Sequence, residues 1–281
     1  LGEALFSPLP EGESWLREIM GNFSASLGDD YYRVGDKCLT LPFDPSVQIL
    51  YYRKDLFEDA RIRREYYEVC KKQLKVPETF AEYDEIARFF TRRFHKNSPV
   101  DYGTSLVFGS SIVAASDYLP RLRAEGGMEV GADGRVKLRE AQAVRALRSY
   151  RDAFLNTDRE TNSWWRRAME AFSDGLVAMN IVFANYASIM LHSKKSEVIG
   201  KIGFAPVPGG RPLGGGVLGI SRDSRKMEAC REFLKWVYDE KTAATITCLG
   251  GYINHRKLTE NMELLELYPW LEGMEEAFAA G

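Results

Sequence analysis

The sequence predicts an α/β protein, and three observations lead to this fold class. Short apolar, β-branched and aromatic runs, such as residues 47–52, 102–108 and 176–182, are typical of strands. Apolar residues at helical spacing, as in residues 80–94, occupy the segments between such runs. The alternation of the two patterns favours a sheet that is covered by helices. With 281 residues the chain can bury a sizeable core, as one large domain or as two lobes.

The composition is that of an ordinary globular protein, with 45% hydrophobic and 28% charged residues. A formal net charge of −2 argues against an electrostatic nucleic-acid footprint, so no nucleic-acid partner is expected. No apolar run approaches the roughly 20 residues that a membrane-spanning helix needs. Residues 1–6 carry neither a positively charged leader nor a long apolar region, so no signal peptide is expected in this sequence.

Residues 1–40 predict a short helix and then a hairpin. Trp15, Ile19 and Phe23 recur at helical spacing after a lead that is rich in proline and glycine. Gly35 and Asp36 are typical of a tight turn between two short strands.

The stretch 41–56, LPFDPSVQILYYRKDL, organises the rest of the chain. Pro45 keeps its start extended, and an apolar strand over 47–52 follows before a charged helix start. Small polar side chains at the start of the stretch could hydrogen-bond a ligand, while the apolar run anchors them in a sheet. The candidate ligand-binding residues here are Asp44, Ser46 and Gln48.

Two helices are predicted after this stretch. The first has Ile62, Tyr66 and Leu74 on one face and Arg and Lys residues mostly on the other, which favours a solvated amphipathic helix over a phosphate or partner site. Pro77 ends this pattern. Thr79 and Glu82 then form a capping box, and the aromatic residues behind it are expected to pack in the core.

Residues 102–127 predict a strand, a turn of small polar residues and a helix that ends at Gly126. Such a junction leaves free N–H groups and hydroxyls at the carboxyl end of the strand, which is a common ligand position in open α/β sheets. Tyr118 on this helix is the candidate that could stack on a ligand. Plain packing in the core is the equal alternative for its ring.

The remaining elements follow the same two patterns. Asp133-Gly134 predicts a hairpin turn, and a long helix extends to about Leu155. Trp165 shares an apolar helical face with Met169 and Phe172, whereas Trp164 lies off that face. Further elements are a strand over 176–182 leading to a short helix at His192, a strand over 201–208, helices over 226–238 and 242–249, and a helix-like tail over 270–279.

No metal, cofactor or catalytic site is expected. The histidines are isolated from one another, and the glycine run 214–216 lacks the sequence of a phosphate loop. The four cysteines are far apart without a CxxC pair, which favours buried free thiols for most of them over disulfides. An enzyme, for example a glycosidase with paired carboxylates, is the disfavoured alternative because no such pair or nucleophile motif is evident.

Four sequence motifs follow one another along the chain: LYYRKDLFE at 50–58, VPETFAEY at 76–83, FSDGLVAMNI at 172–181, and GGGVLGIS at 214–221, which precedes the helix at 229–237. In this order they resemble the extracellular solute-binding proteins of ABC importers, specifically the carbohydrate-binding, maltose-binding-protein-like group. The resemblance implies a type II periplasmic-binding-protein-like fold of two lobes joined by crossovers near 41–56, 214–221 and 252–256.

By the same resemblance, residues 1–43 and 217–253 form a partial first lobe, and residues 44–216 and 254–281 form a largely complete second lobe. The chain is similar to family members that have been shortened at both ends. The family position that often reads Gly-x-Trp corresponds here to a segment in which Asn185 and Tyr186 are the candidate ligand-binding residues. An aromatic ring can cover the apolar face of a sugar, and an amide can bond its hydroxyl rim. Core packing is favoured for the neighbouring Phe183, and it is the equal alternative for Tyr186.

The implied function is to bind a small solute, most readily a mono- or oligosaccharide, in a cleft between the lobes. ABC permease subunits would then receive the solute. The implied location is extracytoplasmic, with a membrane anchor in the intact protein. The alternative is a ligand-sensing domain of a larger regulator or receptor that uses the same fold.

Overall fold

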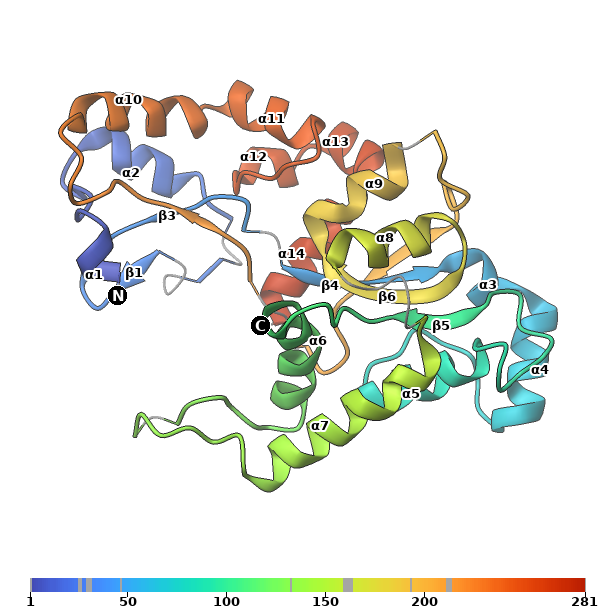
Figure 1. The fold of residues 1–281 in the computed structure, drawn as a ribbon. Coiled ribbons are helices and arrows are strands. Elements are labelled where there is room, and N and C mark those ends of the chain that lie inside the picture. Colours follow the sequence, from blue (N-terminus) through green and yellow to red (C-terminus); the bar gives the residue numbers. More distant parts are fainter. Residues whose placement is uncertain are drawn as a thin grey trace. The chain divides into compact units, whose positions relative to one another are not determined.

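The computed structural model describes residues 2–24, 27–28, 32–45, 47–131, 133–158, 164–192, 194–210 and 214–280 (Figure 1). The chain divides into two compact units. Unit 1 combines residues 1–47 with residues 214–279, and unit 2 combines residues 48–213 with residues 280–281. Each unit has strands and helices, as expected for an α/β chain.

Unit 1 is mainly helical and contains two short antiparallel ladders, β1 with β2 and β3 with β8. Its elements are α1 (Gly2–Leu5), α2 (Ser14–Gly21), β1 (Arg33–Val34), β2 (Lys37–Cys38), β3 (Leu41–Pro42), β8 (Val217–Leu218), α10 (Met227–Val237), α11 (Glu240–Cys248), α12 (Arg256–Thr259), α13 (Met262–Leu267) and α14 (Trp270–Ala280). Its core joins the apolar faces of α2 and α10 to residues such as Leu41 and Ile253.

Backbone hydrogen bonds join the three segments of unit 1 that were predicted as crossovers. The Phe43 N–H donates to the Gly216 carbonyl (3.1 Å), and the Gly216 N–H donates to the Asp44 carbonyl (3.0 Å). The Asp44 N–H donates in turn to the Tyr252 carbonyl (3.0 Å). Gly216 fits this approach because a Cβ there would lie only 2.9 Å from the Phe43 oxygen.

The C-terminal segment, residues 254–281, was assigned to the second lobe from the sequence, and the lobe assignment stays a prediction. Residues 254–279 pack within unit 1. The Ser24 N–H donates to Asn254 Oδ1 (2.7 Å), the Arg256 N–H donates to the Asn22 carbonyl (2.7 Å), and the Ser24 hydroxyl donates to Glu275. These bonds tie the tail to the segment that follows α2, a long-range contact that has no periodic signature in sequence.

Unit 2 is built on a four-stranded sheet of order β5-β6-β4-β7, in which β4 is antiparallel to β6 and β7, and β5 is parallel to β6. Its elements are β4 (Gln48–Arg53), α3 (Lys54–Glu58), α4 (Ala60–Cys70), α5 (Phe80–Phe89), β5 (Tyr102–Ser105), α6 (Ser111–Ala124), α7 (Ala141–Ala153), η2 (Phe154–Asn156), α8 (Trp165–Ser173), β6 (Val177–Phe183), η3 (Ala184–Tyr186), α9 (Ala187–His192) and β7 (Ile202–Ala205).

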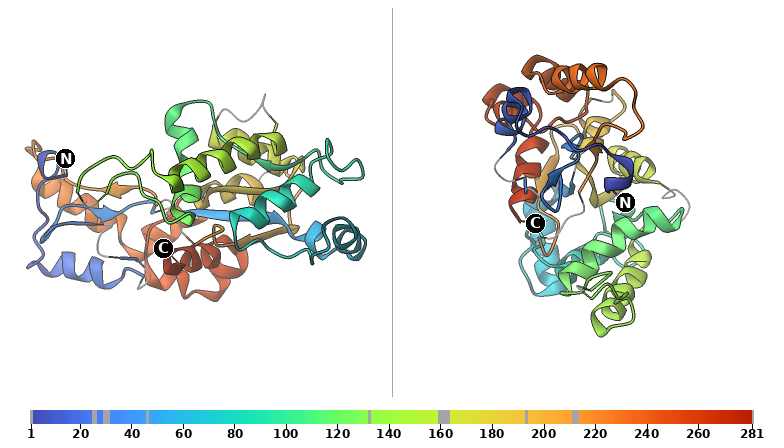
Figure 2. Two further views of the ribbon diagram at one scale, coloured as in Figure 1. Left: turned by 90° about the horizontal axis from the view of Figure 1, so that it is seen from below. Right: turned by 90° about the vertical axis from the view of Figure 1, so that its left-hand side faces the viewer.

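Helices cover both faces of this sheet, as Figures 1 and 2 show for α5 and α8. Leu50 on β4 packs in the core cluster that contains Ile86 and Phe90 of α5. Its neighbour Tyr51 points the other way and meets Phe172 of α8, with ring centroids 6.4 Å apart. Asn180, paired with Tyr51 across the ladder, donates to the Ala168 carbonyl of α8 (3.1 Å). Because the strands are buried on both faces, they carry apolar runs rather than strict alternation.

Two predicted strands are shorter than expected because polar side chains and turns end the ladder. β5 stops at Ser105, after which the Leu106 N–H donates to Thr157 Oγ1 (3.1 Å) and the Val107 N–H donates to Asp117 Oδ2 (2.6 Å). Residues 106–107 therefore bond side chains rather than a neighbouring strand. β7 likewise ends at Ala205.

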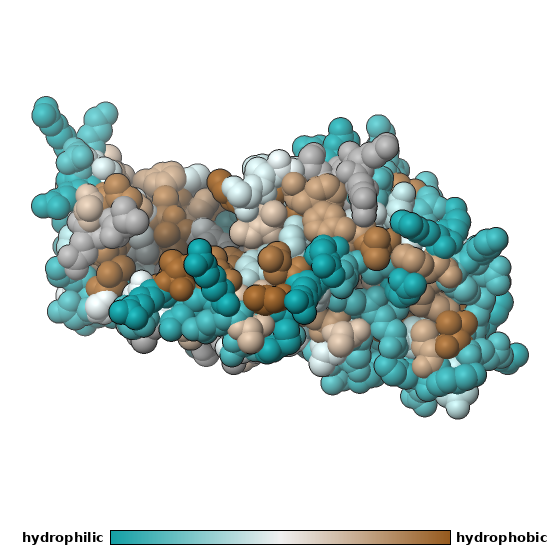
Figure 3. Space-filling view, turned by 60° about the horizontal axis from the view of Figure 1, so that its bottom comes forward, coloured by the Kyte–Doolittle hydropathy of each residue, from teal (hydrophilic) through white to brown (hydrophobic). Residues whose placement is uncertain are grey.

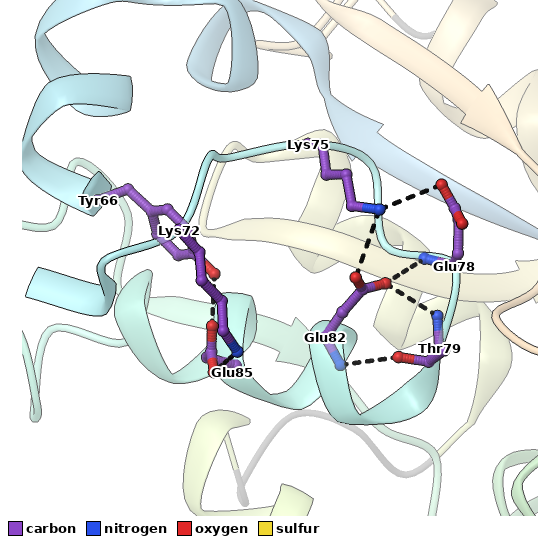
Figure 4. A network of polar contacts seen from close by, with 7 residues as sticks. All are labelled: Tyr66, Lys72, Lys75, Glu78, Thr79, Glu82 and Glu85. Carbon is purple, nitrogen blue, oxygen red and sulfur yellow. Dashed lines mark hydrogen bonds and ion pairs between the residues drawn. The ribbon is translucent and has the colours of Figure 1, made fainter.

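The capping box predicted at the start of α5 is present (Figure 4). The Glu82 N–H donates to Thr79 Oγ1 (3.2 Å), and the Thr79 N–H donates to Glu82 Oε2 (3.3 Å). On the same helix, Glu85 accepts from the Tyr66 hydroxyl (2.9 Å) and from Lys72 (2.7 Å). These bonds attach α4 to α5, which supports the interpretation of α4 as an amphipathic surface helix.

All four cysteines are free thiols, as predicted, but only Cys38 is buried; Cys70 and Cys230 are half-buried and Cys248 is exposed. On the face in Figure 3, hydrophobic residues lie in small groups among hydrophilic ones. Across the part of the chain that the structure describes, no helix combines the length and apolar composition needed to cross a bilayer.

Candidate functional site

Aromatic side chains meet at the carboxyl end of β6, within unit 2. Phe183 is the last residue of β6, and Trp165 is the first residue of α8; their ring centroids lie 5.7 Å apart at an interplanar angle of 83°. Trp164 lies 4.9 Å from the Trp165 ring at 66° and is 47% exposed. We call Trp164, Trp165 and Phe183 the tryptophan surface. It offers an exposed indole that contacts the Trp165 ring, which in turn contacts Phe183.

Ser116 on α6 holds the tryptophan surface in place. The Trp165 indole N–H donates to Ser116 Oγ (2.9 Å), and the Ser116 hydroxyl donates to the Val113 carbonyl (2.6 Å). From β4, the Gln48 amide donates to the Ser116 carbonyl (2.8 Å), and Gln48 also lies opposite Phe183 in the ladder. Three elements, α6, α8 and β4, therefore converge on one serine.

The turn after β6 carries two of the predicted site residues, Asn185 and Tyr186, in η3. The Tyr51 hydroxyl donates to the carbonyls of Phe183 and Ala184, both at 3.2 Å. Complete burial raises the pKa of Tyr51 well above its usual value, so this hydroxyl stays protonated and keeps both bonds. Asn185 and Tyr186 are both half-buried, so each still presents part of its surface to solvent.

The structure places the remaining predicted residues differently. Gln48 is completely buried, so its amide supports Ser116 from within the sheet. The Tyr118 hydroxyl donates to the Ala143 carbonyl of α7 (3.3 Å), and its ring packs between α6 and α7, as the packing alternative proposed. Asp44 belongs to unit 1 and has a left-handed backbone, with φ 46°. Ser46 lies outside the described residues. A role in ligand binding stays a prediction for all of these residues.

Sequence reasoning missed Trp164 and Trp165 as site residues. Trp165 fitted the apolar face of its helix, which indicated ordinary packing. The one signal was that Trp164 lies off that face, so its ring was not accounted for by the packing of the helix. The two aromatics meet Phe183 only because α8 packs on β6, a contact that sequence spacing does not reveal.

A buried carboxylate lies behind this region. Asp117 of α6 accepts from the Val107 N–H, and burial raises the pKa of its carboxyl group to about 7, although that bond and the nearby Arg121 act to lower it. Arg121 itself is buried and forms a bidentate ion pair with Asp84, at 2.7 and 2.8 Å. The loop after β5 therefore depends on a group that titrates near neutral pH.

Metal binding has no support in the described ranges, where no three His, Cys, Asp or Glu side chains come together in a way that could hold an ion.

Comparison with known proteins places this geometry in context. A family model described as "Bacterial extracellular solute-binding protein" matches residues 8–244. A curated protein of Sinorhizobium fredii, named as a probable amino-acid ABC transporter periplasmic-binding protein, is 20% identical over 241 residues. The match covers 85% of this chain and 52% of that protein, so the chain spans about half the length of this relative.

Solved structures show the same fold. A solute-binding protein of Agrobacterium radiobacter K84 in complex with ribitol matches with a TM-score of 0.79 at 21% identity, over 98% of this chain and 68% of that one. A maltose-bound protein of T. maritima matches with a TM-score of 0.76 at 21% identity, again over 98% and 68%. The fold is that of type II periplasmic-binding proteins, which confirms the predicted fold class.

Proposed function

The chain belongs to the bacterial extracellular solute-binding proteins, and we propose that it binds a small carbohydrate or polyol at the tryptophan surface of unit 2. The observation that carries this proposal is the half-exposed Trp164 ring, which meets the Trp165 ring edge to face. Trp165 in turn meets Phe183 edge to face, beside the η3 turn. We further propose that the two units correspond to the two lobes expected from the sequence.

The chemistry of the surface suits an uncharged, hydroxylated solute. An indole face covers the C–H face of a sugar or polyol and removes apolar area from water. Asn185 and Tyr186 provide an amide and a phenol next to the end of β6, and both groups donate and accept hydrogen bonds. A hydroxyl group also donates and accepts hydrogen bonds, so these side chains can bond the hydroxyls of a sugar or polyol.

The charges near the surface argue against an amino acid, although the S. fredii relative is named for one. An α-amino acid needs an anionic partner for its ammonium group and a cationic partner for its carboxylate. The arginines at the start of α8, Arg166 and Arg167, both pair with Glu170, each at 3.0 Å. Glu170, the carboxylate of α8, is thus taken up by two arginines and is not available to the ammonium group of an amino acid.

The wider role follows from family membership and is part of the same proposal. The loaded protein would deliver its solute to ABC permease subunits outside the cytoplasm, held near the membrane by an anchor in the intact protein. A ligand-sensing domain of a larger receptor is the second candidate, and it would use the same surface. Both roles require binding without chemical change of the solute.

A thermal-melt series tests the proposal. Ribitol, maltose and monosaccharides would be added to the full chain, with glycine and leucine as controls. A solute at about 100 times its dissociation constant adds roughly 2.7 kcal/mol of stability, which gives a clear rise in Tm. Trp164→Ala should abolish that rise. Trp236→Ala is the matched control, because Trp236 is 58% exposed on α10 in unit 1.

A rise with a polyol or sugar that survives Trp236→Ala but not Trp164→Ala supports the proposal. A rise with amino acids alone, or a rise that Trp164→Ala leaves unchanged, would contradict it.

A further inference from the structure

One buried tyrosine of β4 holds the turn that follows β6. Tyr51 is completely buried, and its ring packs between Phe172 of α8 (centroids 6.4 Å apart) and Phe204 of β7 (5.6 Å). Its hydroxyl donates to the carbonyls of Phe183 and Ala184, each 3.2 Å away. A tyrosine hydroxyl has a single hydrogen, so the two carbonyls share it. Tyr51 therefore joins the interior of the sheet to the start of the η3 turn.

Two further hydrogen bonds shape the η3 turn from within. The Ala187 N–H donates to the Ala184 carbonyl and closes the turn, and the Ser188 hydroxyl donates to the Asn185 carbonyl (3.3 Å). Both bonds stay within the turn and the start of α9. The Tyr51 hydroxyl, in contrast, reaches the turn from the neighbouring strand, so it sets the position of the turn relative to the sheet.

The η3 turn carries the polar half of the site that the proposed function describes. Asn185 and Tyr186 lie in this turn, and each keeps part of its surface exposed. The aromatic half is fixed separately, because the indole N–H of Trp165 donates to Ser116 on α6 (2.9 Å). Different buried groups thus position the groups that stack on a solute and the groups that bond its hydroxyls.

Stacking and hydrogen bonding differ in how strongly they depend on geometry. Stacking spreads its attraction over many weak atom contacts, so it changes little when one hydroxyl of the solute changes its configuration. A hydrogen bond weakens steeply with distance and angle. Solutes that differ only in the configuration of their hydroxyls are therefore told apart by the hydrogen-bonding groups. A small shift of the η3 turn should reduce this discrimination more than it reduces stacking.

We propose that Tyr51 is a positioning residue that sets the selectivity of the solute site among stereoisomers. The inference rests on the proposed function, to which it adds the source of selectivity. Tyr51 touches no solute, because it is completely buried; it acts by fixing the turn that presents Asn185 and Tyr186. Burial also raises the pKa of Tyr51 well above its usual value, so its hydroxyl remains a donor near neutral pH.

Calorimetric titration of the full chain with sets of stereoisomers tests this proposal. The probes are ribitol, xylitol and arabinitol; glucose, galactose and mannose; and maltose and cellobiose. Within the set that the parent chain binds, we expect an affinity ratio of about tenfold or more between the best and the weakest member, since one mispaired buried hydrogen bond has an effect of this size. Tyr51→Phe removes the hydroxyl and keeps the ring. It should lower this ratio to about threefold or less.

Tyr66→Phe is the matched control. Tyr66 is also buried in unit 2, at 2% exposure, and its hydroxyl donates to Glu85 (2.9 Å) between α4 and α5, away from the η3 turn (Figure 4). Both variants should lose stability, but only Tyr51→Phe should lose selectivity. Amide exchange gives a second measurement, because the Ala187 N–H closes the turn. Its exchange should be faster in Tyr51→Phe and unchanged in Tyr66→Phe.

The proposal is wrong if Tyr51→Phe keeps the affinity ratio of the parent chain, or if Tyr66→Phe lowers that ratio equally. It is also wrong if the parent chain binds all members of a set alike, or if the exchange of the Ala187 amide is the same in Tyr51→Phe as in the parent. In these cases the loss of binding in Trp164→Ala would leave the proposed function standing. If the parent chain binds none of the probes, or if Trp164→Ala binds them unchanged, the proposed function fails and this inference fails with it.

Discussion

The tryptophan surface of unit 2 and the cavity of unit 1 are built in different ways. The first rests on a sheet that helices cover on both faces, and its rings are held by bonds from three elements to Ser116. The second lies between α2, the end of α10 and the starts of α11 and α12, and it is lined by long side chains, several of them exposed. The difference is that the rings of unit 2 are held in a preformed arrangement, whereas the walls of the unit 1 cavity can rearrange. Preformed sites lose little entropy on binding, so we expect the tryptophan surface to be the better ligand site.

The largest expected effect is on stability, and it comes from Asp117, whose carboxyl group is buried in unit 2. The pKa of Asp117 is about 7 in the folded protein, against 3.8 as the ordinary value. Between these values the unfolded chain releases the proton and the folded chain keeps it, so stability falls as the pH rises from about 4 to about 7. At 1.36 kcal/mol per pKa unit the loss is up to about 4 kcal/mol.

Urea unfolding at several pH values checks this. Asp117→Asn should remove most of this loss and be more stable than the parent chain at about pH 8. Asp174→Asn, at the exposed end of α8, should follow the parent curve. The prediction is wrong if the free energy of unfolding of the parent chain, compared with that of Asp117→Asn, does not fall between pH 4 and pH 7. The Asp117 carboxyl group would then be exposed to water in solution.

The close packing of the unit 2 sheet gives the next effect. A Cβ at Gly103 on β5 would lie 1.8 Å from the Ala87 carbonyl oxygen of α5, so strand and helix would have to separate. Gly103→Ala should cost about 3 kcal/mol. Gly12→Ala in unit 1 is the matched control, because a Cβ there meets nothing within 4 Å. If Gly103→Ala and Gly12→Ala had equal midpoints of chemical denaturation, the sheet of unit 2 would not be more closely packed at Gly103 than unit 1 is at Gly12.

Ser116 tests whether the tryptophan surface depends on its support. Ser116→Ala removes the acceptor of the Trp165 indole N–H, at a cost of about 1 kcal/mol in stability. The larger consequence should be for the solute, whose affinity we expect to fall several-fold because the Trp165 ring, and with it Trp164, loses a fixed position. Calorimetric titration of the parent chain and of Ser116→Ala with the same solute measures the two affinities. Unchanged affinity together with lower stability would mean that Trp165 only packs.

Local signals predicted most elements of both units, because helix caps and apolar periods act over a few residues. The Thr79 capping box and the strand at 48–53 are examples. What the sequence could not reveal depends on contacts between distant segments. Asp117, reaching Val107, ends β5 early; Asn254 and Glu275 attach the tail to unit 1. The rings of the tryptophan surface meet only after α8 packs on β6, so the sequence indicated core packing for Trp165 and Phe183 and left Trp164 without a role.

Helix caps provide the smallest test of the contrast between the units. Thr79 caps α5, which buries Tyr83, Ile86 and Phe89, so losing the cap weakens a helix that the whole sheet packs against. Thr79→Ala should lower the free energy of unfolding by about 1 kcal/mol. Asn261 caps α13 in the same manner, but α13 has no buried residue. Asn261→Ala should therefore only increase fraying, seen as faster amide exchange within 262–267, with little change in global stability. If Asn261→Ala lowered global stability as much as Thr79→Ala, the helices of unit 1 would be coupled to its core as tightly as those of unit 2.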